Sequence, residues 1–265
     1  MKKRFSWVAC ILLLFSITII SWKADNVKKH YKARSVKHAN FTAKELFSQY
    51  IDEIYATAQL HEAGLDYTVF QKAVTGYFNL KAANQVSQTS SVITIVDLAK
   101  SSCTKRMWIV DLIDKQLLVH TLVAHGNGSG YDRADYFSNQ NDSHASSLGF
   151  YVTDGIYHGK HGRSLKLDGL DAGFNDNARA RGIVVHAAPY VSESNVNSQG
   201  RLGRSEGCPA VSPKVISKVI ETIKDRTVLF INGNDYTYSS KYLDEEAAAQ
   251  YVYPTNGSSN MNASL

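Results

Sequence analysis

The chain is short of cysteine, of proline and of net charge. It has three cysteines and four prolines among its 265 residues. No proline- or glycine-rich linker divides its middle, so we expect one main domain. The formal charge of +5 falls by four, to +1, without residues 1–24, which hold Lys2, Lys3, Arg4 and Lys23 and no acidic residue. A balance this even argues against the basic surface of a nucleic-acid-binding protein.

Metal-binding signatures are also missing. The chain has nine histidines but neither a His-Glu-x-x-His nor a Cys-x-x-Cys motif. Its best local group is His158 and His161 with Asp168 downstream, and Lys160 between the imidazoles would repel a cation. We therefore expect no metal and no other cofactor. The surrounding loop, residues 157–163, is either a cationic wall for an acidic ligand or a solvated turn.

One cysteine has the sequence context of a nucleophile. Cys208 lies in the polar stretch of residues 203–210, whereas a structural thiol is expected in an apolar run. Gly207 leaves room for a substrate carbonyl, and the amides of Gly207 and Cys208 can point at a developing oxyanion. We expect Cys103 to be a bystander, because a bridge to Cys208 would abolish the nucleophile.

A histidine that can serve as the base precedes this loop. His186 ends the apolar, β-branched segment of residues 183–186, which has the pattern of a buried strand. A histidine at a strand end can remove the proton of a thiol if the fold brings the two together. The same pair also suits a packed thiol and a hydrogen-bonded imidazole with no catalytic role.

The motif around Cys208 resembles a known active-site signature. The four residues 205–208, Ser-Glu-Gly-Cys, resemble the Ser/Thr-His-Gly-Cys signature of YkuD-type L,D-transpeptidases, bacterial enzymes that cross-link or trim peptidoglycan through a cysteine acyl-enzyme. More narrowly, the chain is similar to murein L,D-transpeptidase catalytic domain proteins over residues 45–232. The short sequence motifs on which this similarity rests are residues 122–126, 129–130, 137–139, 146–153, 159–162, 167–170, 175–176 and 207–211.

The resemblance implies a fold and a set of roles. It implies a β-rich α+β fold, a mainly antiparallel sandwich or barrel, that acts on peptidoglycan stem peptides without a cofactor. Cys208 would be the nucleophile and His186 its base. Ser205 would orient His186 or the loop, and the amides of Gly207 and Cys208 would hold the oxyanion.

Three more residues are expected to bind substrate: His125, Arg204 and His161. For His125, in a glycine-rich turn after a strand, the alternative is a structural histidine satisfied by loop carbonyls. The chain departs from the signature at Glu206, whose carboxylate would raise the pKa of the Cys208 thiol if it faced the sulfur. We expect Glu206 to point away.

The fate of the acyl group stays open at this point. An amine acceptor makes the chain a transpeptidase, and water makes it a carboxypeptidase or endopeptidase. Two other classes are a non-catalytic wall-binding module, in which the thiol is idle, and a zinc peptidase.

The first residues have the layout of an export signal. A basic start and the apolar run of residues 5–22 predict a signal peptide or an uncleaved signal anchor over residues 1–24. A basic linker, residues 25–41, follows, and its charge opposes the orientation that export needs. We retain export because the implied substrate lies outside the cytoplasm. The expected location is the periplasm or cell envelope, either free or anchored to the inner membrane.

The remaining chain predicts two helices and then strands. A capping box at Thr42 begins a helical hairpin over residues 42–84, and Asp66 is expected to cap its second helix. A catalytic domain is expected over residues 90–235, with one helix at residues 213–224. The last segment, residues 236–265, reads as a C-terminal tail that is disordered at its end. The predicted strands are residues 92–98, 107–113, 116–124, 149–153, 183–186 and 227–231.

Overall fold

The computed structural model describes residues 41–254. The expected signal segment, nearly all of the basic linker, and residues 255–265 of the expected tail lie outside the described residues. Within residues 41–254, we find no helix with the length and apolar character that crossing a membrane requires.

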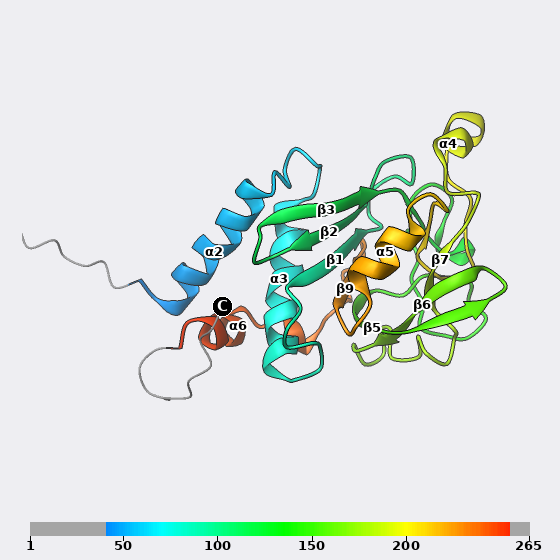
Figure 1. The fold of residues 1–265 in the computed structure, drawn as a ribbon. Coiled ribbons are helices and arrows are strands. Elements are labelled where there is room, and N and C mark those ends of the chain that lie inside the picture. Colours follow the sequence, from blue (N-terminus) through cyan, green and yellow to red (C-terminus); the bar gives the residue numbers. More distant parts are fainter. Residues whose placement is uncertain (1–40, 255–265) are drawn as a thin grey trace, which may run out of the picture. The chain divides into compact units, whose positions relative to one another are not determined.

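Two helices open the described fold, α2 (Ala43–Thr57) and α3 (Tyr67–Ala82) (Figure 1). The predicted capping box is present. The Thr42 side chain accepts from the amide of Glu45, and the Glu45 carboxylate accepts from the amide of Thr42. Asp66 caps α3 through its side chain. Because each cap satisfies backbone donors that a helix start leaves unpaired, both helices begin where the sequence predicts.

The strands form one mixed sheet in the order β3-β2-β1-β9-β5-β6-β7-β8-β4. All pairings are antiparallel except β1 with β9 and β7 with β8. The two outer strands, β3 and β4, are separated in the chain by Leu122 alone, so the sheet curls back until it is nearly closed. The expected β-rich, mainly antiparallel fold is confirmed. The strands are β1 (Val92–Asp97), β2 (Met107–Asp111), β3 (Gln116–Thr121), β4 (Val123–Ala124), β5 (Gly149–Gly159), β6 (Gly162–Gly169), β7 (Val184–Ala187), β8 (Ala210–Val211) and β9 (Val228–Asn232).

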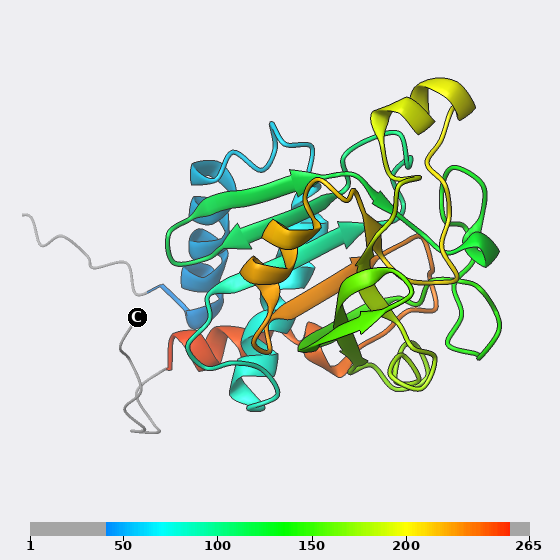
Figure 2. The same cartoon turned by 45° about the vertical axis from the view of Figure 1, so that its right-hand side comes forward.

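Alternate residues of the central strands face two separate cores. Ile95 of β1 and Phe230 of β9 pack with α2, α3 and the late helix α6 (Glu245–Val252). Their neighbours Val96 and Leu229 pack instead with α5 (Ile216–Ile223). This is the period-two alternation from which the strands are predicted. Helices therefore cover both faces of the sheet, with α5 opposite the other three (Figure 2).

The structure adds elements that the sequence pattern does not predict. These are strands β6 and β8 and helices α4 (Glu193–Gln199) and α6. Strand β6 pairs with β5 in a hairpin, so most of the expected 157–163 loop is strand and only Lys160 and His161 form the turn at its tip. Helix α6 lies in the expected tail, yet Ala248 and Ala249 are fully buried against the other helices. The helix expected from Pro213 begins at Ile216, after a turn.

Candidate active site

Strands β7 and β8 lie side by side and bring His186 close to the Cys208 loop. His186 is in register with Ala210, and its amide donates to the carbonyl of Pro209 at 3.4 Å. Cys208 lies two residues before Ala210, in the loop that enters β8. The thiol also contacts β7 directly, because the amide of Val184 donates to Sγ at 3.5 Å. The expected base and nucleophile thus occupy neighbouring segments of the sheet.

The loop that carries Cys208 is held by close backbone packing. Gly207 has a φ of 116°, where glycine is favoured, and a Cβ there would lie 2.8 Å from the carbonyl oxygen of Ala145. A Cβ on Gly126 would lie 2.7 Å from the Cα of Gly207. Ser146 joins the two segments, since its Oγ accepts from the Gly126 amide at 3.0 Å and donates to the Gly207 carbonyl at 3.1 Å. A side chain at either glycine would displace this loop.

Ser205 braces the loop and does not contact the base. Its Oγ donates to the carbonyl of Cys208 at 2.6 Å and accepts from the amide of Gly207 at 3.1 Å. The described chain contains no hydrogen bond between Ser205 and His186. Of the two amides expected to hold an oxyanion, that of Gly207 is thus hydrogen-bonded within the loop, whereas within residues 41–254 the Cys208 amide donates no hydrogen bond.

Burial raises the pKa of the Cys208 thiol, and three neighbours oppose the rise. The amide of Val184 and the positive charges of Arg181 and Lys160 all favour the thiolate. Arg181 lies just before β7, and its guanidinium donates to the carbonyls of Ser138 at 2.7 Å and Ala145 at 2.6 Å. Arg181 is not predictable as a site residue from sequence, because an arginine in a polar loop has no periodic signal.

A backbone carbonyl sets the tautomer of His186. Its Nδ1 lies 2.9 Å from the carbonyl oxygen of Ala187. A carbonyl only accepts, so Nδ1 carries the proton and Nε2 keeps its lone pair. The side chain is 1% exposed. Burial lowers the pKa of His186, the Ala187 carbonyl partly offsets this, and the charges of His161 and Lys160 lower it further. The imidazole is therefore neutral at neutral pH.

His161 lies directly over this base. It projects from the tip of the β5–β6 hairpin, and its ring stacks on that of His186 with centroids 4.2 Å apart and planes inclined by 23°. His161 itself is exposed. The hairpin therefore separates the base from bulk water.

The carboxylate of Glu206 pairs with Nδ1 of His144, and both side chains are exposed. Burial is the main cause of the raised pKa of the Cys208 thiol, and the charge of Glu206 is the weakest of the influences on it. This pairing agrees with the expectation that Glu206 points away from the sulfur.

His125 does not line the cleft, contrary to expectation. Its side chain is 1% exposed, and its Nδ1 lies 2.7 Å from Nη2 of Arg106. Arg106 is itself buried and donates to the carbonyls of Lys100 at 2.6 Å and Val123 at 3.1 Å. Burial, followed by the charge of Arg106, lowers the pKa of His125 to about 4. His125 is thus a neutral, buried histidine whose Nδ1 is held by Arg106, whereas its Nε2 is buried without a hydrogen-bond partner in the described residues.

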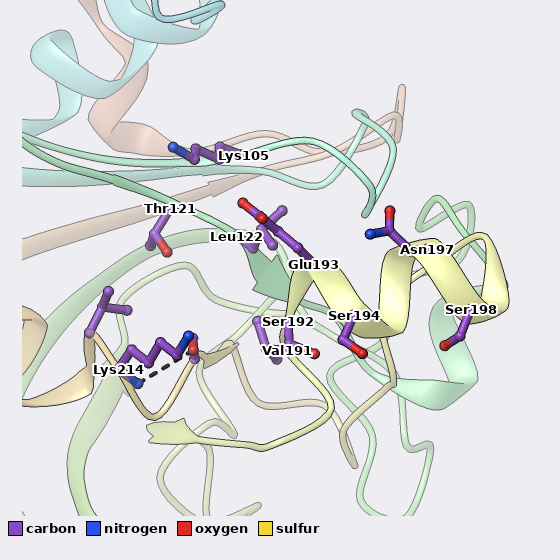
Figure 3. Close-up of a pocket in the computed structure, with 12 residues that line it drawn as sticks. Lys105, Thr121, Leu122, Val191, Ser192, Glu193, Ser194, Asn197, Ser198 and Lys214 are labelled. Atoms are coloured by element: carbon purple, nitrogen blue, oxygen red, sulfur yellow. Dashed lines mark hydrogen bonds between the residues drawn. The ribbon is translucent and has the colours of Figure 1, made fainter.

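Two cavities lie near the loops that precede and follow β7 and β8. Arg204 lines the smaller, of about 350 Å³, together with Glu206. The more spacious one, of about 800 Å³, lies between α4 and the corner where β3 meets β4 (Figure 3). Lys105, Glu193 and Lys214 are among its walls, whereas neither Cys208 nor His186 is. We therefore assign the candidate active site to the Cys208 loop and not to the more spacious cavity.

The described residues hold no group of three His, Cys, Asp or Glu side chains that could bind a metal ion. Asp168 is bound by the guanidinium of Arg179, with Nη2 and Oδ2 2.7 Å apart. Cys103 and Cys208 are both free thiols. The Sγ of Cys103 donates to the carbonyl of Gly200 at 3.1 Å, at the end of α4.

Comparison with known families adds an independent observation. Residues 61–232 match the model of the L,D-transpeptidase catalytic domain. The chain belongs to this family. The match confirms the resemblance read from the motifs, and it runs from before α3 to the end of β9. It includes both His186 and Cys208. No curated protein matches the chain.

Several solved structures, two of them of L,D-transpeptidases, are similar to this chain at low identity. The enzyme from Mycobacterium smegmatis is 14% identical, with a TM-score of 0.34, over 54% of this chain and 59% of its own. An L,D-transpeptidase from Stackebrandtia nassauensis is 15% identical, with a TM-score of 0.34, over 62% and 67%. The helical cell shape determining protein of Campylobacter jejuni is 11% identical, with a TM-score of 0.38, over 68% and 62%. This chain therefore covers less than two thirds of the first of these, and its membership of the family rests on the domain match.

Proposed function

We propose that the protein is an exported L,D-transpeptidase that acts on peptidoglycan stem peptides through an acyl-enzyme on Cys208. The observation that carries the proposal is the pairing of β7 with β8, which brings His186 and Cys208 to adjacent segments within a chain of this family. A nucleophile next to a base that is oriented by a third group is the arrangement that covalent catalysis needs. Here the third group is the carbonyl of Ala187.

Acylation would begin with an uncharged pair. Burial raises the pKa of the thiol and lowers that of the imidazole. His186 Nε2 would take the thiol proton as Cys208 attacks the carbonyl of the third, diamino-acid residue. The C–N bond to the terminal D-amino acid then breaks, and His186 gives its proton to the leaving amine. A thioester and a free D-amino acid result.

The developing oxyanion needs a donor. The amide of Cys208 is our proposed donor, since the amide of Gly207 is engaged by Ser205. Ser205 would act on the loop that carries the nucleophile. His161 and Arg204, which lie over the base and in the neighbouring cavity, are proposed to contact substrate.

Deacylation has two outcomes. Attack by the amine of another stem peptide forms a cross-link, and attack by water releases a shortened stem. The stacked His161 supports the first outcome, because it limits the access of water to His186. The substrate lies outside the cytoplasm, so the proposal includes export, with residues 1–24 as the signal.

The test uses a disaccharide-tetrapeptide and separates the products by mass. We expect the cross-linked dimer from the intact protein and no turnover from Cys208→Ala or His186→Gln. Tripeptide without dimer would assign the protein to the hydrolases instead. Loss of activity in EDTA with the thiol intact would favour a zinc peptidase. A Cys208 thiol that forms no adduct would instead favour a non-catalytic wall-binding module.

A further inference from the structure

A second group of side chains lies near Cys208 and includes Arg204, for which only a contact with substrate has been proposed so far. The cavity of about 350 Å³ is lined by Arg201, Arg204, Tyr190 and Glu206. Glu206 is two residues from Cys208 in the chain. Burial, and after it the charge of a Cys208 thiolate, raises the pKa of Tyr190 to about 12. The cavity therefore lies within electrostatic reach of the reacting sulfur.

Two guanidinium groups gather around one aromatic ring at this cavity. Arg201 lies 4.5 Å and Arg204 5.6 Å from the centroid of the Tyr131 ring. Each guanidinium also donates one hydrogen bond from Nη1 to a backbone carbonyl. Arg201 donates to Leu202 at 2.7 Å, and Arg204 donates to Gly130 at 2.8 Å. The ring and the carbonyls fix both cations in place and leave most of their donors free.

The described chain does not neutralise these two charges. Within residues 41–254 neither arginine has a carboxylate partner, and Glu206, the acid in the cavity wall, pairs with His144. The Nε of Arg201 is buried and has no hydrogen-bond partner in the same residues. A buried donor without a partner is unfavourable, and so are two like charges around one ring. A bound anion would relieve both.

We propose that Arg201 and Arg204 form a carboxylate-binding subsite beside Cys208, filled by a free carboxylate of the stem peptide. A guanidinium binds a carboxylate through two parallel hydrogen bonds, which fixes its orientation. The nature of the ligand rests on the proposed function. A stem peptide offers two such groups, the terminal carboxylate one residue beyond the scissile carbonyl and the free carboxylate of a diamino acid.

The experiment measures binding without turnover. Calorimetry on Cys208→Ala gives dissociation constants for three tetrapeptides: the free acid, its C-terminal carboxamide, and the form amidated only on the diamino acid. We expect one amidated form to bind about 10- to 100-fold more weakly than the free acid, the range for loss of a charge-assisted bidentate contact. Which form weakens identifies the carboxylate.

Variants of the arginine then connect the preference to the subsite. In the Cys208→Ala background, Arg201→Met should remove the difference in affinity between the free acid and the amidated peptide. Arg201→Lys keeps the positive charge but cannot make the bidentate contact, so it should keep part of this difference. Arg133→Met is the matched control, an exposed arginine outside the cavity walls. Equal binding of all three peptides, or a preference that survives Arg201→Met, would overturn the subsite.

This result is independent of the acyl-enzyme. A wild-type protein that forms no thioester would contradict the proposed function, whatever the binding preference. A wild-type protein that forms the thioester but shows no carboxylate preference would contradict the subsite alone. The two proposals therefore fail separately.

Discussion

The ring of His161 stacks on the ring of His186 at 4.2 Å between centroids. The contact joins the tip of the β5–β6 hairpin to the strand next to the Cys208 loop. It covers the imidazole of His186. Burial disfavours the protonated form of His186, which must be neutral to accept the thiol proton.

The first prediction concerns the pH dependence of this pair. Burial lowers the pKa of His186, and the charge of His161 adds to the effect. In His161→Ala the imidazole of His186 is more exposed and the electrostatic contribution of His161 is removed, so the pKa of His186 should rise toward its ordinary value of about 6.5. The acid limb of kcat/KM should then move to higher pH. His158→Ala, on the same hairpin, is the control, and an unmoved acid limb in His161→Ala would contradict the assignment.

A second prediction tests the cation behind the thiol. Arg181 opposes the rise in the pKa of Cys208 that burial causes. Arg181→Met should raise this pKa further and slow alkylation by iodoacetamide at neutral pH, by about threefold to tenfold for a shift of half to one pKa unit. Arg181→Lys should react nearly as fast as wild type.

Arg181 also donates to the carbonyls of Ser138 and Ala145. Melting temperatures of both variants therefore accompany the rates. Equal slowing in Arg181→Met and Arg181→Lys would show that the geometry of the loop, and not the charge, controls the thiol.

A third prediction concerns the departure from the family signature at Glu206. Its carboxylate pairs with His144 and has the weakest influence on Cys208. We expect Glu206→His to shift the thiol pKa by less than about one unit. The measurement is the rate of iodoacetamide alkylation across a pH series. A downward shift of one unit or more would mean that the carboxylate acts on the sulfur in wild type.

The fourth prediction tests the place of α6 in the core. Ala249 is fully buried, whereas Ala247, on the same helix, is exposed. Ala249→Asp buries an unpaired charge and should lower the free energy of unfolding by about 3 kcal/mol or more. Ala247→Asp should leave it nearly unchanged. Urea unfolding of the two variants checks this. Similar unfolding midpoints would contradict the packing of α6 in the core.

Strongly patterned segments were predictable from sequence. Period-two runs locate β1, β2 and β9, and the caps at Thr42 and Asp66 locate α2 and α3. The patterns fail where the apolar signal is weak. Helix α6 buries alanines, and β8 has two residues, so neither offers a period to detect.

The site divides in the same way. Cys208 and His186 stand out because a thiol in a polar loop and a histidine at a strand end are unusual contexts. The expected contact of His125 with substrate could not be checked from sequence. Its partner Arg106 directly precedes β2, whereas His125 directly follows β4, and only the fold brings the two side chains together. Arg181 and Arg201 could not be identified from sequence either, because their partners Ala145 and Tyr131 are distant in the chain.

The most direct test of the account is the mass of the intact protein after brief reaction with tetrapeptide or a carbapenem and quenching in acid. Cys208 is the thiol next to β7, and Cys103 is the other free thiol of the described chain. We predict one adduct, mapped to the peptide that contains Cys208, in wild type and in Cys103→Ser, and none in Cys208→Ala with an unchanged circular dichroism spectrum. An adduct that persists in Cys208→Ala, or that maps to Cys103, would contradict the central claim.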